Sequence, residues 1–150
     1  MKNSEIRDRL GVLVREERRI TREILELLLH AMENRAWLEF GYSTLFDWLT
    51  RGFGYSPAAA MRRIEAARLV RVVPEAKENL GLSVLAKVQG AIRAQEKLEE
   101  VTLEQRKRAV SAVNGLSVPE AEKRLVELFP AVVEKVKREV HRVVDENTTP

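Results

Sequence analysis

The chain has 150 residues, of which 45% are hydrophobic and 33% are charged, and its net charge at pH 7 is +3. This length suits a single domain that buries about two thirds of the surface of its unfolded chain. The sequence contains no cysteine, which excludes disulfides, thiolate metal sites and a cysteine nucleophile, and which fits a reducing compartment.

The first predicted element is a long helical segment at about 4–39, either one helix or a broken one. Its apolar residues recur at near-heptad spacing, and Glu17 interrupts a stripe formed by Ile6, Leu10, Leu13, Ile20, Ile24, Leu27 and Ala31. Such a stripe either joins two chains or packs on its own domain. Further leucines widen the apolar surface beyond a narrow two-stranded seam. We therefore expect the segment 1–40 to pack on the core, and a homodimer through this helix is the alternative.

The same segment gives evidence on localisation, because the signal sequence of an exported protein lies at the start of its chain. It has no apolar signal core, and no run of apolar residues in the sequence is long enough to cross a bilayer. The sequence therefore predicts a cytoplasmic protein without a membrane partner.

Four triplets of glycine, an apolar residue and serine divide the rest of the chain, and they begin at Gly41, Gly54, Gly81 and Gly115. Glycine ends a helix in the left-handed conformation at little cost, and serine caps the first turn of the next helix. The triplets predict helices at about 44–51, 57–72, 75–80, 83–98, 103–113, 118–128 and 131–145. We expect an all-α fold, a compact multi-helix domain with a helix-turn-helix at about 44–72.

This reading also gives an organisation along the chain. After the segment 1–40, we expect a helix-turn-helix-like core at 41–99 and a second helical pair at 100–130. A C-terminal helix at 131–145 is predicted next, with a valine stripe, and the polar residues 146–150 are predicted to be a tail or the start of a linker.

The aromatic residues are concentrated. Seven of the eight lie within 19 residues, at Trp37, Phe40, Tyr42, Phe46, Trp48, Phe53 and Tyr55. Large rings make an efficient small core, so we expect them to fix the angle between the first helix and the next two. The alternative is a platform on which exposed bases stack, which needs several rings on an open basic surface.

The excess positive charge is confined to residues 41–73. Five arginines there, Arg51, Arg62, Arg63, Arg68 and Arg71, stand against Asp47 and Glu65, whereas positive and negative charges balance on both sides of this segment. Guanidinium groups suit phosphate oxygens and the acceptor edge of guanine. The sequence thus predicts that these five arginines contact duplex DNA. The alternative is that the arginines are solvated or paired with neighbouring glutamates.

The start of the predicted recognition helix limits sequence readout. Residues in this position usually reach the bases, and here they are Pro57, Ala58, Ala59 and Ala60, which offer methyl groups but no side-chain hydrogen bonds. We expect binding dominated by phosphates, with modest sequence choice. The small basic run Arg106-Lys107-Arg108 would extend a phosphate-binding track, or it is a solvated helix face balanced by nearby acids.

Several motifs resemble a known family. They are Gly41-Tyr-Ser-Thr-Leu-Phe-Asp-Trp48, the run from Gly54 to Leu69, Val73-Pro74-Glu75, Leu82-Ser83-Val84-Leu85 and the segment 101–123. Together they look like the helical region that precedes the catalytic domain in bacterial HNH endonuclease-type proteins, over roughly residues 20–130. A weaker likeness is to the helix-turn-helix of chromosome-partition (ParB-like) DNA-binding proteins. The resemblance implies a bacterial, non-catalytic DNA-recognition region.

The catalytic pattern of HNH nucleases is missing. Such catalysis needs a histidine base and further ligands around a divalent metal, but this chain has only His30 and His141, each isolated in a predicted helix. The sequence also has no glycine-rich phosphate loop and no serine in a nucleophile-elbow setting. We expect no enzyme activity, no cofactor and no small-molecule substrate for this chain, although a nuclease domain can follow in a longer protein.

These observations predict a DNA-binding helical module, either a piece of an HNH endonuclease-type protein or a standalone relative. Its partner is expected to be duplex DNA, contacted mainly through phosphates. The alternative function is a protein-interaction or dimerisation module without a nucleic-acid role, in which the long first helix and the stripe Val133, Val136, Val140 and Val144 dock a partner.

Overall fold

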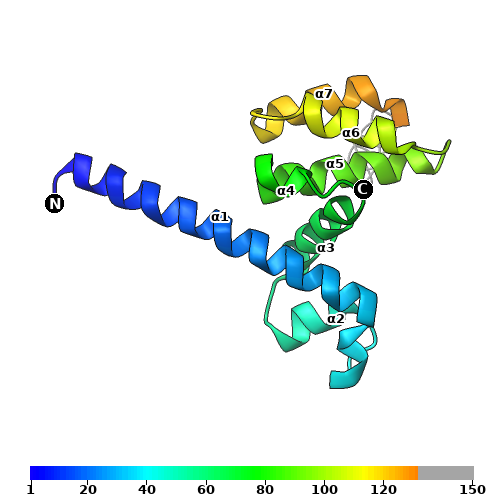
Figure 1. Cartoon of the computed structure of the whole chain (residues 1–150), viewed down its shortest axis with the longest axis horizontal. Coiled ribbons are helices and arrows are strands. Elements are labelled where there is room, and N and C mark those ends of the chain that lie inside the picture. The colour runs from blue at the N-terminus through cyan, green and yellow to red at the C-terminus, as the bar shows by residue number, and fades with distance from the viewer. Residues whose placement is uncertain (132–150) are drawn as a thin grey trace, which may run out of the picture.

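A computed structural model describes residues 1–131, and all the regular structure in this part of the chain is helical (Figure 1). The all-α prediction is therefore confirmed. The elements are α1 (Asn3–Asn34), a 3₁₀ turn (Ala36–Phe40), α2 (Leu45–Asp47), a π-helical turn (Trp48–Gly52), α3 (Pro57–Val72), α4 (Ala76–Asn79), α5 (Leu82–Glu96), α6 (Leu103–Ala112) and α7 (Val118–Leu128). Except for Ala131, the predicted helix at 131–145 lies outside the described residues, as do its valines and the tail 146–150.

Helix α1 packs on the rest of the protein only through its C-terminal third. Leu25, Leu28 and Ala31 are buried there, whereas most of residues 1–20 are exposed. Figure 1 shows the N-terminal part of α1 projecting away from the other helices. Within the segment 1–40, the residues that pack on the core lie in the C-terminal part of α1 and at Trp37. The helical segment is broken at Arg35, which adopts a left-handed conformation with φ of 49°, and the 3₁₀ turn follows the break.

The predicted helix-turn-helix is formed by α2, the π-helical turn and α3. Thr44 begins the first helix, since its side-chain oxygen accepts a hydrogen bond from the amide of Asp47 at 3.0 Å. Gly54 then turns the chain with φ of 78°, a conformation that favours glycine. The hydroxyl of Ser56 accepts a hydrogen bond from the amide of Ala59 at 3.1 Å and so caps α3. Helix α3 therefore begins at Pro57, as the capping serine and the proline predicted.

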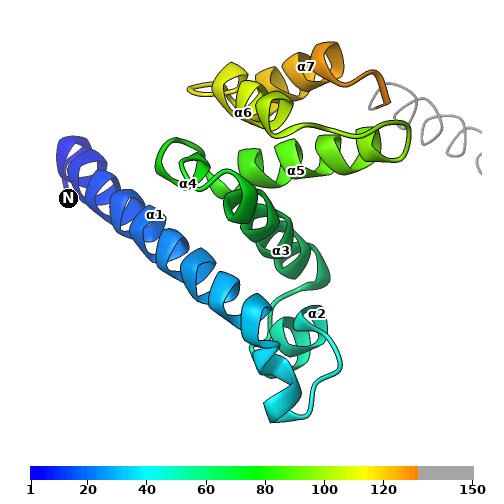
Figure 2. The ribbon, with the colours of Figure 1, turned by 45° about the vertical axis from the view of Figure 1, so that its right-hand side comes forward.

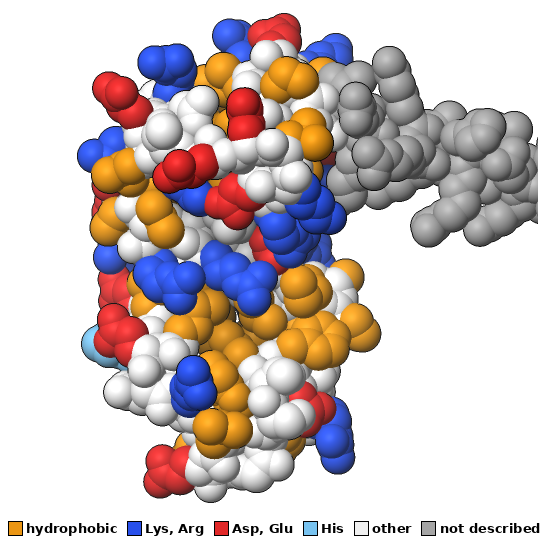
Figure 3. All heavy atoms as spheres, turned by 90° about the vertical axis from the view of Figure 1, so that its right-hand side faces the viewer, with side chains coloured by type: hydrophobic (Ala, Val, Ile, Leu, Met, Phe, Trp, Pro, Cys, Tyr) orange, Lys and Arg blue, Asp and Glu red, His pale blue; other side chains and the backbone are white. Residues whose placement is uncertain are grey.

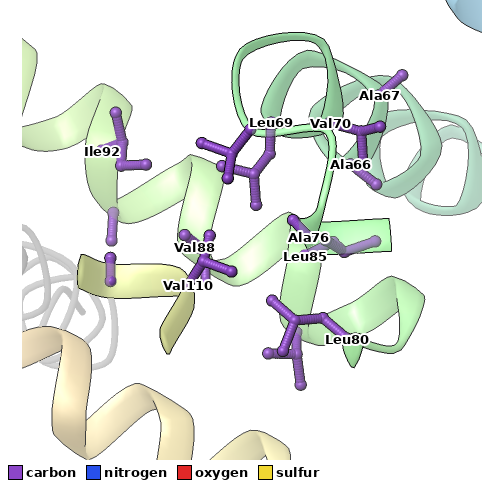
Figure 4. Packing of buried hydrophobic residues seen from close by; sticks show 14 of the residues in the cluster. Ala66, Ala67, Leu69, Val70, Ala76, Leu80, Leu85, Val88, Ile92 and Val110 are labelled. Atoms are coloured by element: carbon purple, nitrogen blue, oxygen red, sulfur yellow. The ribbon is translucent and has the colours of Figure 1, made fainter. Parts of the chain in front are cut away.

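Helix α3 is the centre of the core. It packs between α1 on one side and α5 on the other, as Figure 2 shows. Ala60, Ile64 and Ala67 of α3 are buried in this core. The face toward α5 includes Leu69 and Val70, and Figure 4 shows Leu69 close to α5, the helix that carries Leu85, Val88 and Ile92.

Helices α5, α6 and α7 complete the fold on the side away from α1 (Figure 2). Thr102 and Gln105 form a reciprocal capping box at the start of α6. At the start of α7, the Ser117 hydroxyl accepts a hydrogen bond from the amide of Glu120 at 3.3 Å. In the described part of the chain, no helix combines the length and the apolar character needed to span a membrane.

The aromatic cluster lies at the surface instead of forming a closed core. Phe40 and Phe53 are 59% and 62% exposed, and they flank Trp48 with ring centroids at 5.5 and 5.2 Å. Trp37 and Tyr55 are partly buried against the core. The expected packing role therefore applies to the partly buried rings, which include Trp48.

Candidate nucleic-acid interface

The four arginines of α3 do not share one face of the helix. Since successive residues of an α-helix are rotated by about 100°, Arg68 and Arg71 lie about 60° apart, whereas Arg63 lies about 140° from Arg68. Arg62 is exposed near the start of the helix. It lies about 120° from Arg68, in the rotational direction opposite to Arg63 and Arg71. The structure therefore divides the predicted DNA contacts between two sides of α3.

Arg68 and Arg71 border a groove between α1, the loop before α2, and α3. The groove has a volume of about 620 Å³, and its walls are formed by Met32, Trp37, Ser43, Thr44, Leu45, Phe46, Met61 and Ile64 together with the two arginines. Figure 3 shows a band of Lys and Arg side chains across the middle of one face, next to hydrophobic side chains. This part of α3 thus combines positive charge with a shallow apolar surface.

Glu65 of α3 pairs with two arginines, Arg68 on the same helix and Arg93 on α5. Its side chain is 7% exposed, and Oε1 accepts hydrogen bonds from Nη1 of Arg68 at 3.0 Å and from Nη1 of Arg93 at 2.5 Å. The Glu65 carboxylate therefore holds both guanidinium groups at the surface, where each side chain is 44% exposed. One negative charge stands against the positive charges of Arg68, Arg71 and Arg93, so this cluster keeps a net positive charge.

Arg93 is a candidate contact that the sequence analysis missed. It lies on α5, 28 positions after Glu65, in a segment where acidic and basic residues balance. Only the packing of α5 on α3 brings it beside Arg68. The available signal was Glu65 itself, a carboxylate on the apolar side of a helix, since a buried charge requires a partner.

Arg63 lies on the opposite side of α3. Its Nη1 donates a hydrogen bond to the carbonyl oxygen of Ala59 at 2.9 Å, and its guanidinium carbon lies 4.4 Å from the centroid of the Tyr55 ring. It borders a second cleft, of about 860 Å³, between α1 and the α4–α5–α7 side. Hydrogen bonding and a cation–π contact thus give Arg63 a structural role apart from the Arg68 cluster.

The remaining basic candidates differ in their surroundings. Arg51 is 75% exposed at the end of the π-helical turn and pairs with Asp47 at 3.5 Å. Within residues 1–131, Arg62 and Arg71 form no ion pair. In the second basic run, Arg106 pairs with Glu96, whereas Lys107 and Arg108 are exposed on α6.

One ion pair connects α1 to α4, between Glu26 and Lys77. The Lys77 ammonium group lies 2.9 Å from Oε1 of Glu26, and this hydrogen bond lowers the pKa of the Glu26 carboxyl and raises the pKa of Lys77. The pair ties α1 to α4 at the edge of the second cleft.

The acidic and histidine side chains of residues 1–131 form no group of three or more that could hold a metal ion. His30 is exposed on α1, and His141 lies outside the described residues. Comparison of the whole chain with family models, with curated proteins and with solved structures finds no match.

Proposed function

We propose that this chain binds duplex DNA, mainly through phosphates, at a surface formed by Arg62, Arg68, Arg71 and Arg93. The observation that carries the proposal is the Glu65 cluster, in which a buried carboxylate orients Arg68 and Arg93. Arg71, which forms no ion pair with residues 1–131, is exposed on the same side of α3. Arg62 extends the positive surface toward the start of α3. Arg51 is a flanking contact in this proposal, and Arg63 is not a contact.

Two properties of the cluster favour phosphates over other anions. Guanidinium groups present several donors in a rigid fork that matches phosphate oxygens. Arginines already held in place lose less conformational freedom on binding than free side chains. A regularly charged polymer can engage several of these groups at once, and the resulting release of counterions drives non-specific binding to DNA.

The proposal includes little reading of bases. The first turn of α3 is exposed at Pro57 and Ala58, whose side chains cannot donate or accept hydrogen bonds, and the groove beside Arg68 is lined mostly by apolar residues. Sequence is read through hydrogen bonds and apolar contacts to base edges. Here methyl contacts are the main means of discrimination, which predicts modest specificity.

The resemblance to the helical region of HNH endonuclease-type proteins supports the same proposal. In this interpretation, the chain is a bacterial, cytoplasmic DNA-recognition module without catalysis of its own, and it holds DNA for a nuclease domain in a longer protein or acts as a standalone relative. The likeness to chromosome-partition proteins favours DNA as the partner in either case.

The proposal is tested by fluorescence anisotropy with two labelled duplexes of equal length and unrelated sequence. A mismatched base pair in a specific site costs about 1–3 kcal/mol of binding free energy. A protein that recognises base sequence would therefore bind two unrelated duplexes with very different affinities. We expect both duplexes to bind, with dissociation constants within about tenfold of each other. Failure of both duplexes to bind at low salt would refute the proposal, and a large preference for one would refute its phosphate-dominated form.

A second candidate function is protein–protein interaction without a nucleic-acid role. The exposed apolar residues of α1 favour it, because they lie on the part of the helix that projects from the rest of the protein. The mass of the protein in solution tests this candidate separately from DNA binding.

A further inference from the structure

The N-terminal part of α1 exposes an apolar stripe that only Glu17 interrupts. Ile6, Leu10, Leu13 and Ile20 have 42%, 55%, 63% and 44% of their surface accessible. None of them belongs to the buried core or to the residues packed against it. Contiguous apolar surface of this kind marks an interaction site, since it gains free energy when it is covered.

The spacing of the stripe matches a coiled coil more closely than an ordinary surface helix. From Ile6 onward, the positions alternate in steps of four and three residues through Leu10, Leu13, Glu17, Ile20, Ile24 and Leu27. In heptad notation, Leu10, Glu17 and Ile24 are a positions, and the other four are d positions. A strict period of 3.5 residues keeps one seam directed at a partner helix. The period therefore indicates a helical partner of similar spacing.

We infer that the partner is a second copy of this chain, and that the two α1 helices pair in antiparallel orientation over about residues 3–20. The residues at the edges of the seam favour this arrangement. With Leu10 of one copy opposite Leu13 of the other, Arg9 lies near Glu16 of the second copy, and Lys2 lies near Glu23. Each of these g-position pairs occurs twice by symmetry, and each has opposite charges.

The parallel arrangement is disfavoured by the same sequence. It would place Glu17 of one copy opposite Glu17 of the other inside the seam, where two carboxylates repel and lose hydration. Arg9 and Glu16 would then face Val14 and Thr21 of the second copy and gain no charge partner. The antiparallel register instead places Glu17 opposite Ile6, near the end of the overlap, where water can reach the carboxylate.

The fold accommodates the antiparallel pair. Residues 3–20 span about 27 Å of helix, and most of them lie outside the packed part of α1. Because the two helices run in opposite directions, the remaining helices of each copy lie at opposite ends of the pair. An isolated helix of this length is marginally stable in water, so pairing also stabilises the projecting part of α1.

The dimer is tested by sedimentation equilibrium without DNA. We expect a reversible monomer–dimer equilibrium for the wild-type chain. The double substitution Leu10→Gln with Leu13→Gln should weaken dimerisation by more than about 100-fold, because it removes four leucines from the seam of the dimer. Glutamine keeps a high helix propensity, so α1 is not broken directly. The control is Val12→Gln, since Val12 is an exposed apolar residue of α1 that lies off the stripe.

Charge reversal tests the orientation. In the antiparallel dimer, Arg9→Glu should weaken dimerisation about tenfold, since two attractive pairs become repulsive, and the double variant Arg9→Glu with Glu16→Arg should restore it. A chain that stays monomeric up to about 1 mM would overturn the inference and assign the stripe to a different protein. A dimer unaffected by the leucine substitutions, or one insensitive to Arg9→Glu, would overturn the interface or its orientation.

Discussion

Replacing Arg62, Arg68, Arg71 and Arg93 with alanine is expected to weaken binding to duplex DNA by at least about 100-fold at 50 mM salt. These side chains form the proposed phosphate-binding surface on α3 and α5. Each phosphate contact that is lost also removes the release of a counterion, and this release is the main driving force at low salt. Anisotropy titration of a labelled duplex measures the change. The Glu65 carboxylate is left without its two partners, so a fifth change, Glu65→Gln, is added in a parallel variant.

Two controls separate this surface from net charge. Replacing Lys107, Arg108, Lys123 and Arg124 with alanine removes four positive charges from α6 and α7, so this variant and the four-arginine variant both go from +3 to −1. We expect the α6–α7 variant to retain most of its affinity. Arg63→Ala is the control within α3, because Arg63 faces the other cleft. Equal losses in the two four-residue variants would show that net charge, not this surface, governs binding.

The second large effect is expected in the core. Leu69 is 0% exposed and lies on the face of α3 that packs on α5, so Leu69→Ala should lower the free energy of unfolding by about 2–5 kcal/mol through lost burial and the cavity left behind. Urea denaturation followed by circular dichroism measures this change. Since α3 and α5 carry the proposed DNA contacts, the same variant should lose DNA binding as it unfolds.

The matched control is Leu98→Ala. Leu98 is 63% exposed, and an exposed substitution is expected to change the free energy of unfolding by less than about 0.5 kcal/mol. If Leu69→Ala costs no more than this control, α3 is not the centre of the core, and the orientation of its arginines has no support.

The start of α3 could be predicted from the sequence because two adjacent residues determine it. Ser56 caps the first turn and Pro57 occupies the first helical position, so the helix begins where these two residues place it. The end of α1 could not be predicted in the same way. The helix stops at Asn34 because Arg35 has a positive φ, and arginine carries no local signal for that conformation.

The candidate site could be predicted only in part. The local charge excess identified α3, but it could not show that Arg63 would turn toward Tyr55 or that Arg93 would reach Glu65. Both outcomes depend on which faces of α3 are covered by α1 and α5.

The salt dependence of duplex binding by the wild-type chain tests the central claim most directly. A surface of about four arginines should give a plot of log affinity against log salt with a slope near −3 or steeper, since each phosphate neutralised contributes about −0.9. Anisotropy titrations between about 50 and 200 mM salt cover the useful range. A slope near zero, or no binding at the lowest salt concentration, would contradict a phosphate-binding function for α3.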